Sequence, residues 1–268
     1  MNSHTDSAGM LLRRWRERRR LSQLALATQA SISQRHLSFV ESGRSRPSRD
    51  MVLHLGDQLD VPLRERNILL AAAGFAPYFP QTARDNPGFD AMRDLIQRVL
   101  YGHMPHPALA ADRYWILLTA NEAIRALLKD VDPKLLEGDV NVLRLSLHPD
   151  GLAPRIVNLR EWRHHLVMRL DHDIKVSADQ TLVDLRDEIA ALPVPLSRGP
   201  ERFASQHESR LAVPLVLRTD DGPVSFLSTT TVFGTSVDVT LSEVVIEAFL
   251  PADAGSVPSR SGANGVQE

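Results

Sequence analysis

Apolar residues recur at helical spacing through the first 74 residues, in short runs separated by residues that favour helix ends. Ser22 and Ser33 are suited to cap the second and third of these runs at their N-terminal ends. Gly43 is suited to end the third run, because glycine adopts positive φ without strain after a helix. Pro62 suits the first turn of a fifth run. The pattern predicts five short helices between Leu11 and Gly74.

The stretch from Gly74 to Gly88 contains three prolines and predicts a linker, after which the pattern changes to mixed helix and strand. We expect strands at Leu109–Asp112, Tyr114–Thr119, Leu211–Thr219, Val224–Phe233 and Val237–Leu250, and helices near Phe89–Leu100, Asn121–Leu128, Asn158–Leu170 and Gln180–Leu192. The residues Asp220, Asp221 and Gly222 predict a hairpin between two of these strands. The segment Glu243–Phe249 is compatible with either helix or strand.

These patterns together predict an α+β protein with two domains. We expect an all-α domain of five helices at residues 8–76, a linker at 77–88, and an α+β domain with an antiparallel sheet at 89–250. The last residues, 251–268, are rich in glycine, serine and proline, and we expect them to be disordered.

Composition narrows the class of protein further. The chain has no cysteine, which excludes disulfides and thiolate metal sites. No apolar run approaches the roughly 18 residues that a membrane span needs. The basic residues near the N-terminus are not followed by the apolar segment of a signal peptide. We therefore expect a soluble, cytoplasmic protein with no membrane partner.

Charge is distributed unevenly along the chain. Residues 1–76 contain twelve arginines and seven acidic residues, a net charge of +5, which leaves −7 for the rest of a chain whose total is −2. A basic N-terminal segment followed by an acidic remainder, here called the body, is typical of a DNA-binding domain attached to a regulatory domain. It is also compatible with a solvated, arginine-rich helix, so charge alone does not assign a function.

The segment from Leu21 to Ser48 carries the most specific motif in the chain. It combines Ser-Gln at the start of the second helix, a small residue at Ala27, an Ile-Ser corner at 32–33, and Glu41-x-Gly-x-x-x-Pro47. It resembles the helix-turn-helix domain of the XRE family, the Cro/CI phage-repressor type. The resemblance spans Leu11–Gly74 and implies sequence-specific binding of double-stranded DNA by a transcriptional regulator.

The resemblance also implies which residues contact DNA. In this family the third helix lies in the major groove, and its first, second and sixth positions contact base edges. Those positions are Gln34, Arg35 and Phe39, and their side chains suit adenine, guanine and the thymine methyl group respectively. The residues expected to bind phosphate are Gln23, Arg44 and Arg46, and those expected to reach either phosphate or base are Ser33 and Ser38.

Three further positions of this motif have structural consequences. Arg16 and Glu41 resemble the paired charges that join the first helix to the end of the third, and we interpret them as architectural. Ser31 stands where the family usually has a glycine, so a residue with a side chain must adopt the bend. Leu24 stands where the family usually has a polar residue, and it is a candidate contact for the body domain or a second subunit.

The body resembles, more loosely, the ligand-binding domain of MmyB-like transcriptional regulators, which has a PAS-like fold. The matching stretches are Pro107–Asn121, Asn141–Leu152 and Val157–Trp162. The resemblance implies an apolar, fatty-acid-like ligand between the sheet and its helices. An ionised head group would need a partner, and the candidates near these segments are Arg144 and Arg163. The expected lining is Trp115, Leu117, Leu143, Leu147, Trp162, Leu166, Phe226 and Phe233. The alternative is that these side chains only fill a core.

The remaining polar residues give no sign of a metal site, a cofactor or catalysis. His164 and His165 are adjacent on an expected helix and point about 100° apart, so they do not chelate one ion together. No nucleophile elbow or glycine-rich phosphate loop is present. We therefore expect a regulator rather than an enzyme. The rival class is an enzyme whose C-terminal domain does the chemistry while the N-terminal domain only brings it to DNA.

We also expect a homodimer on an inverted-repeat operator, since one head of this type covers half a site. The main alternative to a ligand-binding body is a module that only dimerises or binds a protein partner, as in an antitoxin.

Overall fold

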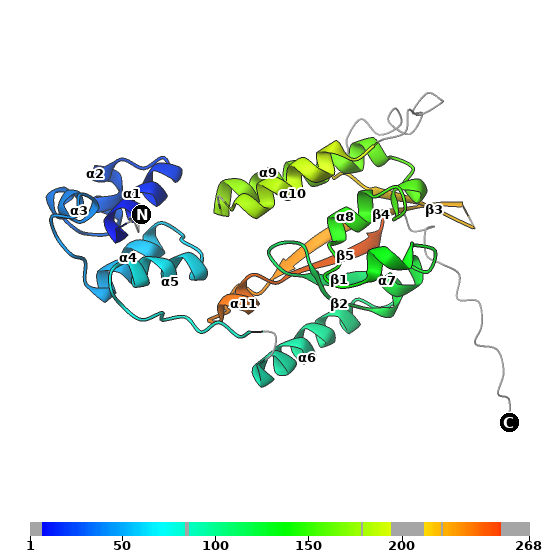
Figure 1. Cartoon of the computed structure of the whole chain (residues 1–268), viewed down its shortest axis with the longest axis horizontal. Coiled ribbons are helices and arrows are strands. Elements are labelled where there is room, and N and C mark those ends of the chain that lie inside the picture. The colour runs from blue at the N-terminus through cyan, green and yellow to red at the C-terminus, as the bar shows by residue number, and fades with distance from the viewer. Residues whose placement is uncertain (1–6, 84–85, 178, 194–211, 221, 253–268) are drawn as a thin grey trace. The chain divides into compact units, whose positions relative to one another are not determined.

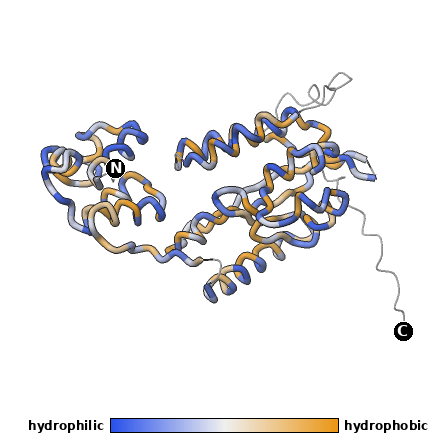
Figure 2. The backbone as a smooth tube through the Cα atoms, viewed as in Figure 1, coloured by the Kyte–Doolittle hydropathy of each residue, from blue (hydrophilic) through white to orange (hydrophobic). Residues whose placement is uncertain are grey.

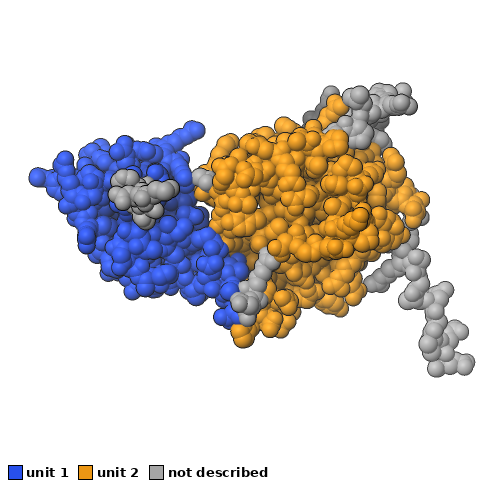
Figure 3. Space-filling view, viewed as in Figure 1, with its two compact units in different colours: residues 1–86, 234–242 blue, residues 87–233, 243–268 orange. Residues whose placement is uncertain are grey.

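The computed structural model describes residues 7–83, 86–177, 179–193, 212–220 and 222–252 of the 268-residue chain. The tail expected at 251–268 lies outside the described residues apart from its first two. The chain divides into two compact units, shown in separate colours in Figure 3. The first comprises residues 1–86 and 234–242, and the second comprises residues 87–233 and 243–268.

The first unit contains the five helices expected from the sequence (Figure 1). They are α1 (Ala8–Arg18), α2 (Gln23–Gln29), α3 (Gln34–Glu41), α4 (Arg49–Gln58) and α5 (Leu63–Ala72). The hydroxyl of Ser22 accepts a hydrogen bond from the N–H of Ala25, and Ser33 caps α3 in the same way. Gly43 follows α3 with φ +75°, as its position predicts. Local sequence therefore determines where these helices begin and end.

The core of this unit is formed by one apolar face from each helix. Trp15, Leu26, Leu37, Leu55 and Leu70 are all buried in one cluster. Figure 2 shows the matching alternation of hydrophobic and hydrophilic residues along the tube. The helices therefore pack as a bundle whose polar faces are left for solvent or a partner.

Helices α1 and α3 cross very closely. A Cβ atom added to Gly9 on α1 would lie 2.1 Å from the carbonyl oxygen of Val40 on α3. Only a glycine permits this approach, because the obstacle is backbone and cannot rotate away. The position of α3 in the unit therefore depends on the absence of a side chain at Gly9.

The segment from 77 to 83, expected to be a linker, is hydrogen-bonded to the rest of the first unit. The side chain of Asn67 on α5 donates to the carbonyl of Phe79 at 2.8 Å and accepts from its N–H at 3.1 Å. The carboxylate of Asp238 accepts two hydrogen bonds from Thr82, at 3.1 and 2.8 Å. The N–H of Val239, at the start of α11 (Val239–Ser242), donates to the carbonyl of Pro80. Residues 234–242, which lie between two strands of the second unit, thus join the first unit.

The second unit combines one antiparallel sheet with helices. Its helices are α6 (Pro87–Gly102), α7 (Glu122–Leu127), α8 (Val142–Leu147), α9 (Leu159–Ser177) and α10 (Gln180–Ala191), with short 3-10 turns η1 (Pro133–Leu136) and η2 (Ala153–Arg155). Its strands are β1 (Ala108–Ala111), β2 (Leu117–Ala120), β3 (Leu215–Thr219), β4 (Gly222–Val232) and β5 (Val245–Pro251). The strand order is β2-β1-β5-β4-β3, and every neighbouring pair is antiparallel. The predicted α+β class is confirmed, and so is the hairpin that joins β3 to β4.

Of the strand expected at Leu211–Thr219, Leu211 lies outside the described residues and β3 begins only at Leu215. Two further strand predictions were wrong in detail. The strand expected from Tyr114 begins only at Leu117, because a tight turn precedes it in which Trp115 has φ +64°. The backbone carbonyl of Asp112 accepts a hydrogen bond from the N–H of Trp115, and its carboxylate accepts from the N–H groups of Tyr114 and Ile116. The strand expected from Val237 is interrupted by α11, and β5 begins at Val245. In both places a turn that is stabilised by side-chain hydrogen bonds replaces extended chain.

The two faces of the sheet are covered by different helices. Leu109 and Ala111 on β1 belong to the cluster that is shared with α7, α8, α9 and α10. Ala108 and Ala110 alternate with them, so they face the other side, where α6 packs on β1 and β2. The larger core therefore lies on the face that carries Leu109.

Candidate functional site

The exposed start of α3 carries the residues expected to contact bases. Gln34 and Arg35 are exposed, and Phe39 is half-buried one turn further along the helix. The guanidinium groups of Arg35 and Arg44 lie 5.4 and 5.9 Å from the centre of the Phe39 ring. Cation–π contacts at these distances hold the two arginines beside one aromatic side chain. Basic and apolar groups are thus brought together on one face of α3.

The expected pair between Arg16 and Glu41 is present and buried. Arg16 donates to both oxygens of Glu41, at 2.7 and 2.9 Å, and to the carbonyl of Leu21 at 2.8 Å. The hydrogen bonds that Arg16 donates to Glu41 raise the pKa of Arg16. This pair joins α1 to the end of α3 and fixes the position of the exposed helix face.

Gln23 takes part in the same network. Its side-chain amide donates to Glu41 at 2.8 Å, so its orientation is fixed by a carboxylate. The other expected phosphate ligands, Arg44 and Arg46, are both exposed, as is Ser33, while Ser38 is half-buried. The amide of Gln23 therefore already has an acceptor within the protein.

The turn between α2 and α3 contains the predicted non-glycine bend. Ser31 has φ +52°, and the N–H of Ile32 donates to the carbonyl of Ala27. Leu24, the candidate contact for a partner surface, is 60% exposed.

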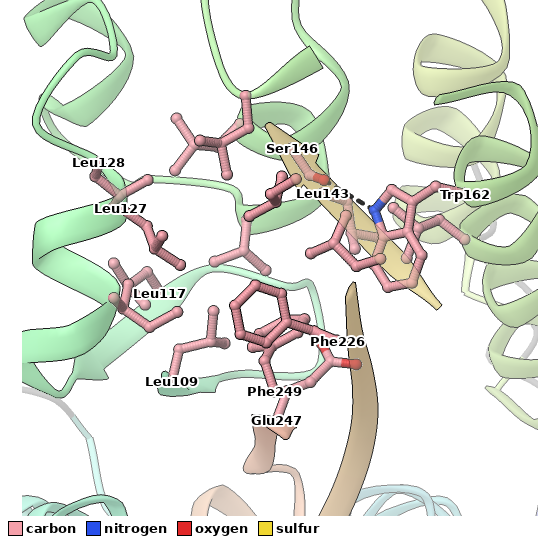
Figure 4. A pocket seen from close by; sticks show the side chains of 17 residues that line it. Leu109, Leu117, Leu127, Leu128, Leu143, Ser146, Trp162, Phe226, Glu247 and Phe249 are labelled. Carbon is pink, nitrogen blue, oxygen red and sulfur yellow. Dashed lines mark hydrogen bonds between the residues drawn. The ribbon is translucent and has the colours of Figure 1, made fainter. Parts of the chain in front are cut away.

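The second unit contains a cavity on the larger core face of its sheet. It lies among strands β1 to β5 and helices α7, α8 and α9, as Figure 4 shows from close by. Its lining is Leu109, Leu117, Ile124, Leu127, Leu128, Val142, Leu143, Leu145, Ser146, Leu152, Trp162, Leu166, Leu215, Leu217, Phe226, Glu247 and Phe249. Fifteen of these seventeen side chains are apolar, so the cavity suits an apolar molecule.

The cavity is narrow in this structure. About 70 Å³ of it is open to the centre of a water-sized molecule, and about 720 Å³ is free of atoms when the gaps and the open mouth are counted. The smaller value bears on a ligand, because the larger one includes open solvent. Pockets for drug-sized ligands hold about 300–1,000 Å³. A long chain therefore enters only if the leucine side chains move apart.

Five of the eight residues expected around a ligand lie in this lining. These are Leu117, Leu143, Trp162, Leu166 and Phe226.

The other three lie outside the lining. Trp115 is buried, but its ring lies 4.3 Å from the guanidinium of Arg169 and its indole hydrogen-bonds to Asp173. Leu147 is buried in the same core without reaching the cavity, and Phe233 follows the end of β4. The turn that precedes β2 directs Trp115 away from the position that a strand would have given it.

Two polar side chains interrupt the apolar lining. The indole N–H of Trp162 on α9 donates to the hydroxyl of Ser146 on α8 at 3.1 Å, the dashed line in Figure 4. Glu247 on β5 is 4% exposed and forms an ion pair with Arg169 on α9. Arg169 also donates to the hydroxyl of Thr230 on β4 at 2.9 Å. The only charged group among the described lining residues is therefore a carboxylate.

The two arginines named as candidate partners for an ionised head group have partners within the protein. Arg144 makes a two-point ion pair with Glu188 on α10, at 2.5 and 2.8 Å. Arg163 donates to the carbonyls of Ala190 and Leu192 at the end of α10. Both arginines project from the sides of their helices that face α10, and neither lines the cavity.

Helix α9 carries two titratable groups close to the Arg169–Glu247 pair. Burial raises the pKa of Asp173, against the opposing effect of Arg169. Burial and the nearby Arg169 lower the pKa of His165, whose ring stacks on Trp162 with centroids 5.2 Å apart. Ionisation of Asp173 is therefore less favourable in the folded protein than in the unfolded chain, and the folded state loses stability as this carboxyl group ionises.

Sequence reasoning missed Glu247 and the leucines of α7. Glu247 was missed because the segment around it was compatible with helix or strand, and its partner Arg169 is 78 residues away. Leu127 and Leu128 were missed because a short apolar helix gives no sign of which side faces a cavity. A signal was available for Glu247, since an acidic residue within an otherwise apolar strand requires a partner.

Within the described ranges, His, Asp and Glu side chains form no group of three that could hold a metal ion. In the same part of the chain, every helix is too short or too polar to span a bilayer.

Comparison with known protein families agrees with this division of the chain. A helix-turn-helix domain model matches residues 7–69. A model described as the MmyB-like transcription regulator ligand binding domain matches residues 92–257, more than half of the chain. No curated protein matches the chain significantly. The chain therefore belongs to the family of the MmyB-like transcription regulator ligand-binding domain, which here follows a helix-turn-helix domain.

Proposed function

We propose that this DNA-binding transcription regulator contacts operator DNA through α3 and that an apolar ligand in the second unit changes its affinity for the operator. The DNA-binding proposal rests on the exposed start of α3, where Gln34 and Arg35 face solvent and Arg35 contacts the ring of Phe39. A helix placed in the major groove presents such side chains to base edges. Arg44 and Arg46, exposed after α3, then bind phosphates.

Two arginine variants separate base contacts from phosphate contacts. Arg35→Ala should cost about 1–3 kcal/mol on an operator selected from random duplexes and relax the preference at one base pair. Arg44→Ala should weaken binding on all sequences alike and flatten the salt dependence by about one unit. Arg125→Ala, at an exposed arginine on α7, is the matched control and should change neither. Equal losses for Arg35→Ala on operator and random DNA would remove it from the base-contacting set.

We infer further that the regulator acts as a homodimer on an inverted repeat. One helix-turn-helix head covers half a site, and two heads reach successive major grooves about 34 Å apart. Sedimentation velocity of the full-length protein, free and on an operator duplex, tests this assignment. A single copy of the chain in both conditions would contradict it.

The ligand proposal rests on one observation, the cavity with fifteen apolar side chains on the main core face of the sheet. Burial of an acyl chain there contributes about 0.8 kcal/mol per methylene, which offsets the displacement of the leucines. Native mass spectrometry of the full-length protein should detect a retained apolar molecule. Leu117→Phe, which fills the cavity, should lose it, whereas Val232→Phe at an exposed position on β4 should retain it.

If no molecule is retained and no apolar compound binds, the second unit acts through dimerisation or a protein partner instead. Co-purification of a stoichiometric protein would favour that function.

A further inference from the structure

A buried carboxylate in the lining restricts the ligands that the cavity can accept. Glu247 lies in the middle of β5, opposite Leu109 of β1 in the sheet register, and its side chain reaches the lining beside Phe249 (Figure 4). It is 4% exposed, so water does not screen it effectively. Any ligand that fills the cavity beside Phe249 meets the Glu247 carboxylate.

The guanidinium of Arg169, which balances the charge of Glu247, already has partners within the protein. One terminal nitrogen of Arg169 contacts Glu247 and the other donates to Thr230. The face of the same guanidinium lies 4.3 Å from the ring centre of Trp115. Arg169 itself is outside the lining, and none of the described lining residues is an arginine, lysine or histidine.

This arrangement selects against charged end groups of either sign. An ionised carboxylate would lie beside Glu247 with no lining cation to pair with, and repulsion between like charges is strong at a buried site. A cationic end group would compete with Arg169 for the same carboxylate. A neutral hydrogen-bond donor is neither repelled by Glu247 nor in competition with Arg169 for its charge. The carboxylate oxygen accepts a hydrogen bond from such a donor strongly.

We propose that the ligand is an uncharged, elongated apolar molecule whose end group donates a hydrogen bond to Glu247, as a long-chain alcohol does. The inference rests on the proposed ligand-binding function and specifies the chemical class of the ligand. It departs from the free fatty acid that the family resemblance implies, because the only charged group among the described lining residues is a carboxylate.

A chain-matched series of compounds tests the inference on the unmodified protein. Decan-1-ol, decanoic acid and decane are titrated into full-length protein at about pH 8, where the acid is ionised. Displacement of a neutral fluorescent probe gives the three affinities. Decan-1-ol should bind about tenfold more tightly than either of the other two, the difference expected for one hydrogen bond to a charged acceptor.

The variant Glu247→Gln identifies the group responsible. Removing the carboxylate leaves Arg169 without its counter-charge, so the preference for alcohol over acid should disappear or reverse. Glu188→Gln removes a carboxylate from the ion pair with Arg144 outside the cavity, and it should keep the tenfold preference. Circular dichroism of each variant verifies folding. If Glu247→Gln does not fold, the affinities of the unmodified protein for decan-1-ol, decanoic acid and decane still test the inference.

The outcomes distinguish the two proposals. Decanoic acid binding as tightly as decan-1-ol would overturn the inference about the end group and leave the apolar ligand in place. Decane binding as tightly as decan-1-ol would do the same, because the donor would then contribute nothing. Failure of all three compounds to bind would overturn the ligand-binding function together with the inference.

Discussion

Replacing Gly9 by alanine should destabilise the DNA-binding unit, although helix propensity alone predicts the opposite. Alanine is favoured over glycine inside a helix by at most about 1 kcal/mol. Against this, the new Cβ would lie 2.1 Å from the carbonyl oxygen of Val40, in a range that real Cβ atoms essentially never occupy. Helices α1 and α3 would have to separate by about 1 Å, and overpacking of this kind costs about 1–3 kcal/mol or more.

The separation would also stretch the two hydrogen bonds from Arg16 to Glu41, now 2.7 and 2.9 Å long. We therefore expect the unfavourable contact to exceed the gain in helix propensity. Gly56 on α4 provides the matched control. A Cβ there would lie 3.4 Å from the side chain of Arg66, an ordinary contact with a flexible group. Gly56→Ala should therefore stabilise the same unit by up to about 1 kcal/mol.

Hydrogen–deuterium exchange of peptides within residues 8–72 of the full-length protein measures the stability of this unit separately from the other. Exchange of the slowest amides should become about 5- to 100-fold faster in Gly9→Ala, and slower in Gly56→Ala. Slower or unchanged exchange in Gly9→Ala would refute the reasoning, because it would mean that α1 and α3 separate at no cost.

Three further predictions concern buried charges and the segment 234–242. Glu41→Ala should destabilise the first unit by about 3–5 kcal/mol, seen as exchange in α3, because it leaves a buried guanidinium unpaired; a loss below about 1 kcal/mol would contradict this. Asp173→Asn should raise the thermal stability increasingly as pH rises from about 4 towards neutral, since a raised pKa means that the folded wild type loses stability as Asp173 ionises. A constant difference across that range would show that ionisation of Asp173 is not the cause. Asp238→Ala should speed exchange at 80–83 and 238–242 but not in α3, because it removes both hydrogen bonds to Thr82; unchanged exchange at 80–83 would show that the linker is held otherwise.

The helix-turn-helix unit could be predicted closely because its signals are local. Ser22 and Ser33 cap the helices that follow them, and Gly43 and Ser31 adopt the positive φ that their positions require. Each of these signals acts within about four residues, so the sequence carries it directly. The pair between Arg16 and Glu41 spans 25 residues and was anticipated only through resemblance to a family.

The cavity was less predictable because its chemistry depends on distant partners. Large apolar residues such as Leu143 and Phe226 were recognised as candidates, but an apolar residue beside a cavity has the same sequence signal as one in a solid core. Glu247 acquires its role from Arg169, which is 78 residues away and on a different element. Trp115 was misplaced because a turn at positive φ, rather than a strand, sets its direction.

The participation of residues 234–242 in the first unit has a consequence for how such regulators are inherited. A recombination event in the linker would exchange the five helices between two genes but leave this segment behind with the body. In the hybrid, Asp238 would meet a foreign residue at the position of Thr82, and the N–H of Val239 would meet a foreign backbone at Pro80. Selection should therefore preserve heads and bodies of this kind as one hereditary unit, with positions 82 and 238 changing together.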